Sequence, residues 1–275
     1  MHVSFITANY VAREIGFRGW TDWGAADRAT RDAFHGPNFG QKFDELCRLV
    51  KQAGFSNIDI WVAHLDPLRA TDAMVDRAAD TLQRHGLRVV AYTAGLGRPD
   101  MARQDAERVY QVARKIGAPL LGVGLNPSNE KLAYELGKEY GIRYAIENHP
   151  EKSPRELLDR LGRMPSGYTD LIGVAQDTGF WGMFGYDAVE ATHELKDVLF
   201  HMHLKQVKRF PDGQWGSCAY DEGVLDMASI VRALVEIGYQ DAVSVEHEPH
   251  DEDPTEAVVR SGEQLRSWLG SVARS

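Results

Sequence analysis

Cysteine is scarce in this sequence, which has only two, Cys47 and Cys218, among 275 residues. They lie far apart in unrelated contexts, so the sequence contains neither a disulfide framework nor a cysteine-based zinc site. Low cysteine use without disulfides is typical of a reducing compartment. We therefore expect a cytoplasmic protein.

Long apolar runs and positive charge are also in short supply. No stretch reaches the roughly 18 apolar residues that span a bilayer, and no basic segment followed by an apolar one opens the chain, so we expect neither membrane insertion nor export. The 31 Lys and Arg are outnumbered by 40 Asp and Glu, giving a formal net charge of −9. Because nucleic-acid binding depends on Lys and Arg at the phosphates, we expect a small molecule as the partner instead.

The sequence does contain a regular alternation of short apolar runs and amphipathic segments, which predicts repeated β–α units. The predicted strands are 2–8, 57–63, 88–93, 119–124, 142–148, 171–176, 198–204 and 242–248. The predicted helices are 38–53, 72–85, 99–116, 128–140, 153–161, 226–237 and 254–269. Glycines such as Gly117 and Gly141 follow helical segments, where a left-handed C-cap is common.

Eight strands with intervening helices predict an α/β protein, a (β/α)8 TIM barrel formed as one domain over residues 1–275. A doubly wound open sheet is the rival, but no Gly-x-Gly-x-x-Gly follows the first strand. Residues 9–39 and 206–225 form long connections, and long loops are usually functional. The first carries four aromatic rings that either cover a bound ring or pack between loops. They are Trp20, Trp23, Phe34 and His35.

Four consecutive late strands end in side chains suited to metal binding or acid–base chemistry. These side chains are Glu147, Asp177, His203 and Glu246. Taken singly, each could be an ordinary helix cap or packed residue, but strand ends converge in a parallel barrel. Three buried carboxylates repel one another unless paired or coordinated, and a divalent cation resolves the conflict. The mixed oxygen and nitrogen donors favour Mn²⁺, with Mg²⁺, Co²⁺ or Zn²⁺ as alternatives.

Three neighbouring residues extend this candidate site, because side chains two apart on a strand share a face. His149 shares the face of Glu147, and because imidazole groups in general can exchange protons near neutral pH, we predict that it acts as a base. His201 shares the face of His203 and either contacts substrate or is a packed interior histidine. Lys205 either binds an anionic group of the substrate or belongs to a solvated basic loop.

These segments resemble the xylose isomerase-like barrels, also called the sugar phosphate isomerase/epimerase superfamily, over nearly the whole chain. The resemblance is most specific in Ala-Ile-Glu-Asn-His-Pro (145–150), Gln-Asp-Thr-Gly (176–179), His-Met-His-Leu-Lys (201–205) and Ser-Val-Glu-His-Glu-Pro (244–249). It implies that Glu147, Asp177, His203 and Glu246 hold the metal. It also implies that His64 lies near the substrate, and that the chain forms a homo-oligomer, alone or with a small partner subunit.

The resemblance implies a metal-dependent isomerase or epimerase that acts on a sugar or keto-sugar through an enediolate, with Glu147 and Glu246 transferring the proton. Elimination from a keto-sugar is the alternative, as in inosose dehydratases and the barrel subunits of C-glycoside deglycosidases, with His149 as base. Gln206 stands where the family commonly has an Asp. Phe180 stands where ketose 3-epimerases have a substrate-contacting His. That His is also needed by endonuclease IV-type nucleases, so its absence and the acidic charge argue against them. The intact ligand set argues against a vestigial sugar-binding subunit.

Overall fold

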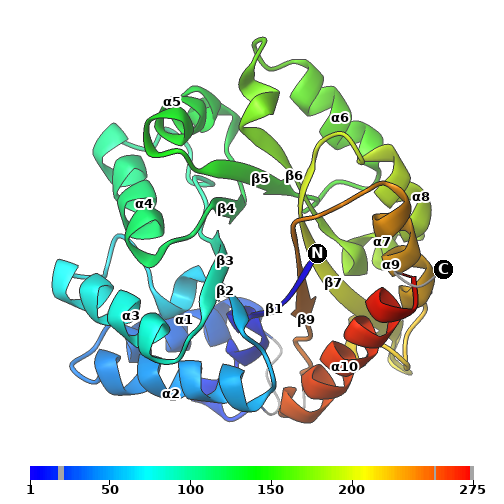
Figure 1. Ribbon diagram of the computed structural model, residues 1–275, viewed down its shortest axis with the longest axis horizontal. Helices are drawn as coiled ribbons and strands as arrows, with labels where there is room; N and C mark the ends of the chain where they lie inside the picture. Colours follow the sequence, from blue (N-terminus) through cyan, green and yellow to red (C-terminus); the bar gives the residue numbers. More distant parts are fainter. Residues whose placement is uncertain (18–21, 251, 273–275) are drawn as a thin grey trace.

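The structure, a computed structural model, describes residues 1–17, 22–250 and 252–272. It is a closed barrel of eight parallel strands surrounded by helices, which confirms the predicted (β/α)8 fold (Figure 1). The barrel strands are β1 (His2–Ile6), β2 (Asn57–Trp61), β3 (Arg88–Thr93), β4 (Leu120–Val123), β5 (Arg143–Glu147), β6 (Ile172–Asp177), β7 (Leu199–Arg209) and β9 (Ala242–Glu246). Each strand pairs with the next, and β9 pairs with both β7 and β1, which closes the ring.

Each predicted helical segment contains a helix, and most of the ends lie within two residues of the predicted ones. These helices are α2 (Phe39–Gln52), α3 (Asp72–Arg84), α4 (Arg103–Ile116), α5 (Glu130–Tyr140), α6 (Pro154–Gly162), α9 (Met227–Glu236) and α10 (Thr255–Val272). Gly117 and Gly141 end α4 and α5 with positive φ angles of 78° and 67°, as predicted. In the described part of the chain, no helix is long and apolar enough to span a membrane.

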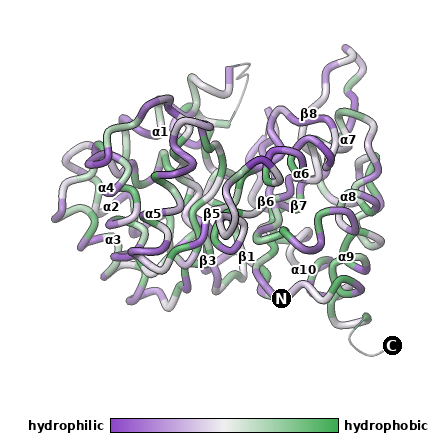
Figure 2. The backbone as a smooth tube through the Cα atoms, turned by 90° about the horizontal axis from the view of Figure 1, so that it is seen from above, coloured by the Kyte–Doolittle hydropathy of each residue, from purple (hydrophilic) through white to green (hydrophobic). Residues whose placement is uncertain are grey.

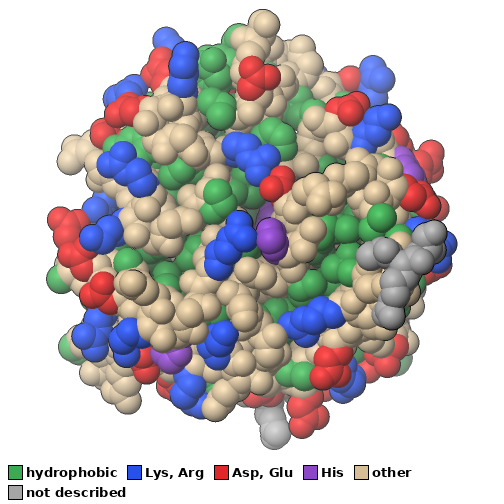
Figure 3. Space-filling view, viewed as in Figure 1, with side chains coloured by type: hydrophobic (Ala, Val, Ile, Leu, Met, Phe, Trp, Pro, Cys, Tyr) green, Lys and Arg blue, Asp and Glu red, His purple; other side chains and the backbone are tan. Residues whose placement is uncertain are grey.

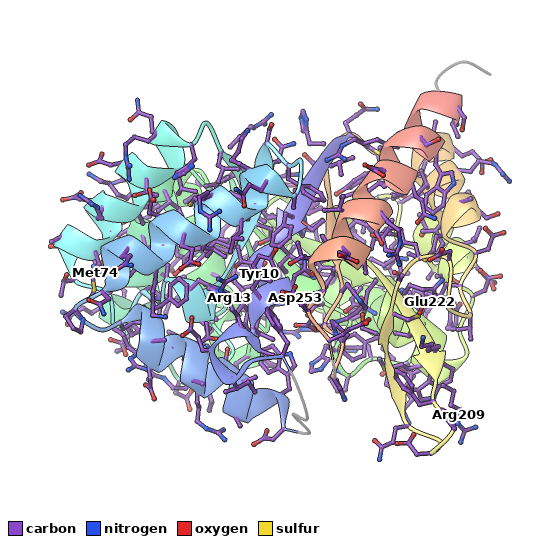
Figure 4. All side chains as sticks on the ribbon, turned by 90° about the horizontal axis from the view of Figure 1, so that it is seen from below. Tyr10, Arg13, Met74, Arg209, Glu222 and Asp253 are labelled. Atoms are coloured by element: carbon purple, nitrogen blue, oxygen red, sulfur yellow. The ribbon has the colours of Figure 1, made fainter. Side chains whose placement is uncertain are left out.

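The two long connections were predicted as loops, but both contain regular structure. The first contains α1 (Trp23–Phe34). In the second, β7 runs past its predicted end and turns back as the antiparallel strand β8 (Trp215–Cys218). This hairpin projects on the opposite side of the molecule from the N-terminus (Figure 2), with Arg209 towards its far end (Figure 4). Two short helices after β6 were also not predicted, α7 (Thr178–Phe184) and α8 (Ala188–Glu194).

The barrel interior contains a buried polar layer. The hydroxyl groups of Ser4 and Ser244 lie 2.7 Å apart, and Asp59 and His201 are buried beside them. A separate small apolar cluster consists of Ala91, Leu120, Ala145 and Ala175, with Phe200 packed against it. The main apolar core is the larger cluster, which includes the buried faces of the surrounding helices. Because buried polar groups need partners, a polar layer inside a barrel indicates a specific role.

Candidate functional site

A cavity of about 230 Å³ brings together six of the predicted site residues. They are Glu147, His149, Asp177, His203, Lys205 and Glu246. The cavity lies where β5, β6 and β9 reach their C-terminal ends and β7 continues into its hairpin, the end of the barrel at which chemistry is expected in this fold. Its remaining lining includes Trp23, Trp61, Phe180 and Glu248.

A larger cavity, of about 890 Å³, lies elsewhere, between α7, α8 and the segment leading into α9. Its lining contains only two ionisable carboxyl groups, those of Asp187 and Asp226, and each caps a helix. We therefore assign the candidate site to the smaller cavity, where acid, base and metal-ligating groups converge.

The centre of the site is formed by His203 and two glutamates. His203 Nδ1 lies 2.5 Å from Glu147 Oε1 and 3.4 Å from Glu246 Oε2, and the three ligand atoms lie within 4.8 Å of one another. Burial alone would lower the pKa of His203, but the two carboxylates raise it well above its ordinary value. For Glu147, burial is outweighed by His203 and Lys205, and its pKa is lowered.

Asp59 contacts the other ring nitrogen of His203. It was not among the predicted site residues. Its Oδ2 lies 3.2 Å from His203 Nε2 and 2.9 Å from His201 Nε2, while Oδ1 accepts a hydrogen bond of 2.5 Å from Thr93. The histidine partners outweigh complete burial and lower the pKa of Asp59. Asp59, His201 and His203 also have the spacing of a metal site. Because Asp59 and His201 do not line the cavity, we interpret them as support for His203.

Asp177 caps the N-terminal end of α7 and also lines the cavity, so it is both a helix cap and a site residue. Its Oδ1 accepts a 2.7 Å hydrogen bond from the backbone N–H of Gly179 at the start of α7. Its Oδ2 lies 3.5 Å from Lys205 Nζ. Asn148 fixes the backbone by bonding both the N–H and the carbonyl of Asp177. Burial, together with the charge of Glu147, raises the pKa of Asp177.

Lys205 places its ammonium group between carboxylates. Nζ lies 2.8 Å from Glu246 Oε1 and 2.8 Å from Glu248 Oε2, and these partners raise its pKa well above the ordinary value despite burial. Burial, with the charges of Asp177 and Glu248, raises the pKa of Glu246 to about 8. Glu248 was also not among the predicted site residues, although residues two apart on a strand share a face and Glu248 lies two residues after Glu246. It also accepts a hydrogen bond from Trp23 Nε1 at 3.1 Å.

His149 reaches the cavity from the end of β5, two residues beyond Glu147. Its side chain is exposed and packs edge-on against Phe180, with 4.4 Å between the ring centroids. Lys205 Nζ lies 5.8 Å from the centre of the same phenyl ring. His149 is therefore accessible to a molecule in the cavity, although its role as a base stays a prediction.

His64 and His201 do not line this cavity. His64 is buried against Phe34, with 4.7 Å between the rings, and borders a separate small cavity. His201 lies one layer deeper in the barrel than His203, where it bonds to Asp59. Neither position supports direct contact with substrate, so these two assignments stay predictions.

The aromatic loop contributes to the site only in part. Trp23 lines the cavity and packs edge-on against Trp61 at 5.2 Å. His35 caps the C-terminal end of α1 and instead accepts a hydrogen bond from the backbone N–H of Asp66. Trp20 lies outside the described residues.

The two departures from the family pattern have local explanations. Phe180 provides the ring against which His149 packs. The side chain of Gln206 bonds the backbone of Tyr220 and Leu225, and so fixes the segment that follows the hairpin. Lys208 is paired with Glu222 at 2.7 Å on the hairpin and belongs to its solvated face.

Comparisons with known proteins agree with this architecture. A family model described as xylose isomerase-like TIM barrel matches residues 47–268. A similar solved structure is a xylose isomerase-like TIM barrel protein from Mycobacterium smegmatis in complex with magnesium, with 17% identity and a TM-score of 0.69 over 85% of this chain and 90% of that chain. No curated protein sequence matches the chain.

Two further structures carry enzyme names. The probable 3-DHS dehydratase AsbF from Bacillus anthracis has 13% identity and a TM-score of 0.66, and the match covers 97% of this chain and 99% of that chain. The 3-keto-D-glucoside 4-epimerase from E. coli has 16% identity and a TM-score of 0.62, covering 82% and 94%. At these identities, the likeness to solved structures shows a shared fold alone.

Proposed function

Because the chain belongs to the xylose isomerase-like TIM barrel family, we propose that it is a divalent-metal-dependent isomerase or epimerase of a sugar or keto-sugar. The observation that carries the proposal is the convergence of Glu147, His203 and Glu246, whose ligand atoms lie within 4.8 Å of one another in the cavity. Asp177 completes a set of three carboxylates and one imidazole. This set matches the ligands of first-row divalent cations, and we propose Mn²⁺ first.

The charges around the cavity fit a bound cation. Glu147, Asp177, Glu246 and Glu248 line it together with Lys205 and His203. Without a metal the carboxylates keep His203 protonated, and a bound cation would take the place of that proton. In the described part of the chain, Glu246 Oε2 is buried and accepts no hydrogen bond. A buried carboxylate oxygen without a donor is costly, and a cation at this position would satisfy it.

The carboxyl groups of Glu147 and Glu246 are suited to moving a proton on a substrate. In the metal-free protein the pKa of Glu147 is lowered, whereas that of Glu246 is raised to about 8, so the environments of the two carboxyl groups differ. A base and an acid whose pKa values are pushed apart can remove a proton beside a carbonyl and return one to the same or the adjacent carbon. The bound cation would supply positive charge beside the substrate oxygens.

The walls of the cavity support a sugar-sized substrate. A volume of about 230 Å³ lies a little below the roughly 300–1,000 Å³ of most small-molecule sites and suits a single small ring. Trp23, Trp61 and Phe180 give it apolar surfaces against which the carbon face of a sugar ring can pack. The carboxylates and Lys205 also line the cavity and would bind hydroxyl and carbonyl oxygens. The E. coli epimerase named above acts on a keto-glucoside, and we propose the same substrate class here.

Elimination from a keto-sugar is the second candidate, and His149 favours it. Its exposed imidazole lines the cavity in addition to the two glutamates. A third proton-transfer group allows one residue to remove a proton while another protonates a departing group.

One experiment tests the proposal and separates the two reactions. Protein loaded with Mn²⁺ is incubated in D₂O with D-fructose, 3-keto-D-glucose and a 2-keto-inositol, and the products are followed by NMR. Deuterium incorporated into a product that retains every carbon and oxygen supports isomerisation or epimerisation, whereas loss of water supports elimination. Absence of both reactions with this panel, for protein that binds Mn²⁺, would count against the sugar or keto-sugar assignment.

A further inference from the structure

The opposite end of the barrel contains another cavity, of about 70 Å³. It is lined by His2, Arg88, Arg143, Phe200, His201 and Asp241, among others. Most of these residues belong to the N-terminal ends of β1, β3, β5 and β7 or lie just before β9. The cavity therefore opens at the mouth that faces away from the candidate active site.

The packing of the barrel leaves room at this mouth. Bulky branched side chains usually fill the interior of such barrels in layers. Here the small cluster near the cavity contains three alanines, Ala91, Ala145 and Ala175, beside Leu120 and the ring of Phe200. Leu120 and Phe200 also line the cavity. The three alanines do not line the cavity themselves but fill the layer beside it with short side chains.

The cavity has an excess of positive charge. Arg143 pairs with Asp241 at 3.0 Å, and its guanidinium lies 4.7 Å from the centre of the Phe200 ring. Across residues 1–17, 22–250 and 252–272, Arg88 forms no ion pair, and its Nη1 lies 3.3 Å from His2 Nε2. Two guanidinium groups and one carboxylate thus line the cavity. In the view of Figure 3, basic side chains and a histidine gather near the middle of the molecule.

We propose that this mouth, formed by Arg88, Arg143 and His2, binds a small oxyanion such as inorganic phosphate. A guanidinium is planar and offers parallel N–H donors that match the oxygens of phosphate. Arg143 is held in place by Asp241 and Phe200, which lowers the entropy lost on binding. Arg88 contributes the charge that no carboxylate balances. The volume, about twice the share of one water molecule in liquid, suits an ion and not a sugar.

This site is separate from the candidate active site. Between the two cavities lies the buried hydrogen-bonded layer, in which His201 bonds to Asp59 and Asp59 bonds to His203. An anion at the N-terminal mouth therefore does not occupy the position of the sugar. The inference does not depend on the proposed enzyme activity.

Calorimetric titration of the full chain with inorganic phosphate, with any affinity tag at the C-terminus, tests the proposal. We expect saturable binding that weakens at least about tenfold in Arg88→Gln and in Arg143→Gln, as loss of a charge-assisted hydrogen bond predicts. Arg88→Lys keeps the positive charge but loses the parallel N–H donors of the guanidinium, so this variant should bind phosphate with intermediate affinity. Arg48→Gln, on the outer face of α2, is the matched control and should bind like the wild type.

Two outcomes would overturn the proposal. One is the absence of saturable phosphate binding by the wild type; the other is equal affinity in Arg88→Gln, Arg143→Gln and the control. Circular dichroism establishes that each variant is folded. A parallel titration with glycerol phosphate identifies the source of the phosphate: binding of the inorganic ion alone indicates free phosphate, and equal binding of both indicates a phosphate group on a larger molecule.

Discussion

The carboxylate of Asp59 lies 3.2 Å from Nε2 of His203, so the imidazole turns Nδ1 towards Glu147 and Glu246. Histidines that bind metals generally bond their second nitrogen to a carboxylate or carbonyl, which fixes the ring and its tautomer. Asp59 is itself held by His201 and by the hydroxyl of Thr93. We infer that this buried aspartate orients the imidazole for a cation at the C-terminal mouth.

Replacement of Asp59 by Asn should weaken binding of Mn²⁺ by about 10- to 100-fold, the usual cost of losing such a partner. The amide is nearly isosteric, but it carries no charge to hold the ring of His203. Calorimetric titration of metal-free protein with Mn²⁺ measures the effect. Asp80→Asn, on the exposed face of α3, is the control and should bind like the wild type. Equal affinity in the Asp59 variant would show that its carboxylate does not support the site.

Replacement of Lys205 by Met removes the ammonium shared by Glu246 and Glu248. Breaking a buried ion pair from one side destabilises a protein by up to about 3–5 kcal/mol, less where the carboxyl groups take up protons instead. The metal-free variant should therefore unfold at a lower temperature than the wild type. Added Mn²⁺ should stabilise the variant more than the wild type, because a cation replaces the missing charge.

Thermal unfolding with and without Mn²⁺ measures both effects of the Lys205 change. Lys208→Met is a matched control, since Lys208 pairs with Glu222 on the exposed hairpin, where an ion pair contributes at most about 1 kcal/mol. If Mn²⁺ raised the unfolding temperature equally in both variants and the wild type, Lys205 would not share carboxylates with the metal.

Replacement of His149 by Ala should leave Mn²⁺ binding unchanged, because His149 is not among the clustered ligand atoms. If His149 transfers a proton, turnover of the keto-sugar identified in the D₂O experiment should fall by about 10²- to 10⁴-fold. Metal affinity and rate are measured on the same preparation. His193→Ala, on the exposed side of α8, should keep both. A His149 variant with full activity would remove this residue from the mechanism.

The stability of the protein should fall as the pH drops from about 6.5 towards 3, and His64 should contribute to this fall. Burial and the nearby His35 lower the pKa of His64 to about 3, compared with an ordinary value of 6.5. Between these values the unfolded chain binds a proton at His64 that the folded chain does not. The stabilising contribution is thus complete above the unfolded pKa and is lost as the pH falls towards the folded pKa.

Urea unfolding between pH 7 and pH 4.5 measures this contribution. His64→Gln should reduce the slope of unfolding free energy against pH by up to about 1.4 kcal/mol per pH unit, the value for one proton. His85→Gln, a partly exposed histidine at the end of α3, provides the comparison. Parallel curves for the wild type and the His64 variant would contradict the prediction.

The sequence predicted the barrel because each strand is a compact apolar run and several helices end at a glycine such as Gly117. It also predicted that Glu147, Asp177, His203 and Glu246 lie together, since the ends of parallel strands must converge, and all four line one cavity. Their role as metal ligands stays a prediction. Asp59 carried a visible signal, an acidic residue between Ile58 and Ile60 in an apolar run. Its partner His201 lies 142 residues away, a distance over which local patterns give no pairing.

The missed secondary structure has similar causes. Pro211, Asp212 and Gly213 form a turn signature that indicates a hairpin. Yet β8 has only four residues, among them Gly216 and Ser217, and lacks the apolar run of a barrel strand. The helix α1 begins with Trp23 and Gly24, which are weak helix formers. Its position depends on tertiary contacts, among them the packing of Trp23 against Trp61.

The central claim is that Glu147, Asp177, His203 and Glu246 bind one divalent cation. The most direct test is the metal content of the chain, measured by elemental mass spectrometry after exposure to Mn²⁺ and removal of unbound metal, for the wild type and for Glu246→Gln. We predict about one ion per chain in the wild type and a clear loss in the variant, with both proteins folded. No bound metal in the wild type, or equal occupancy in the two proteins, would contradict the account.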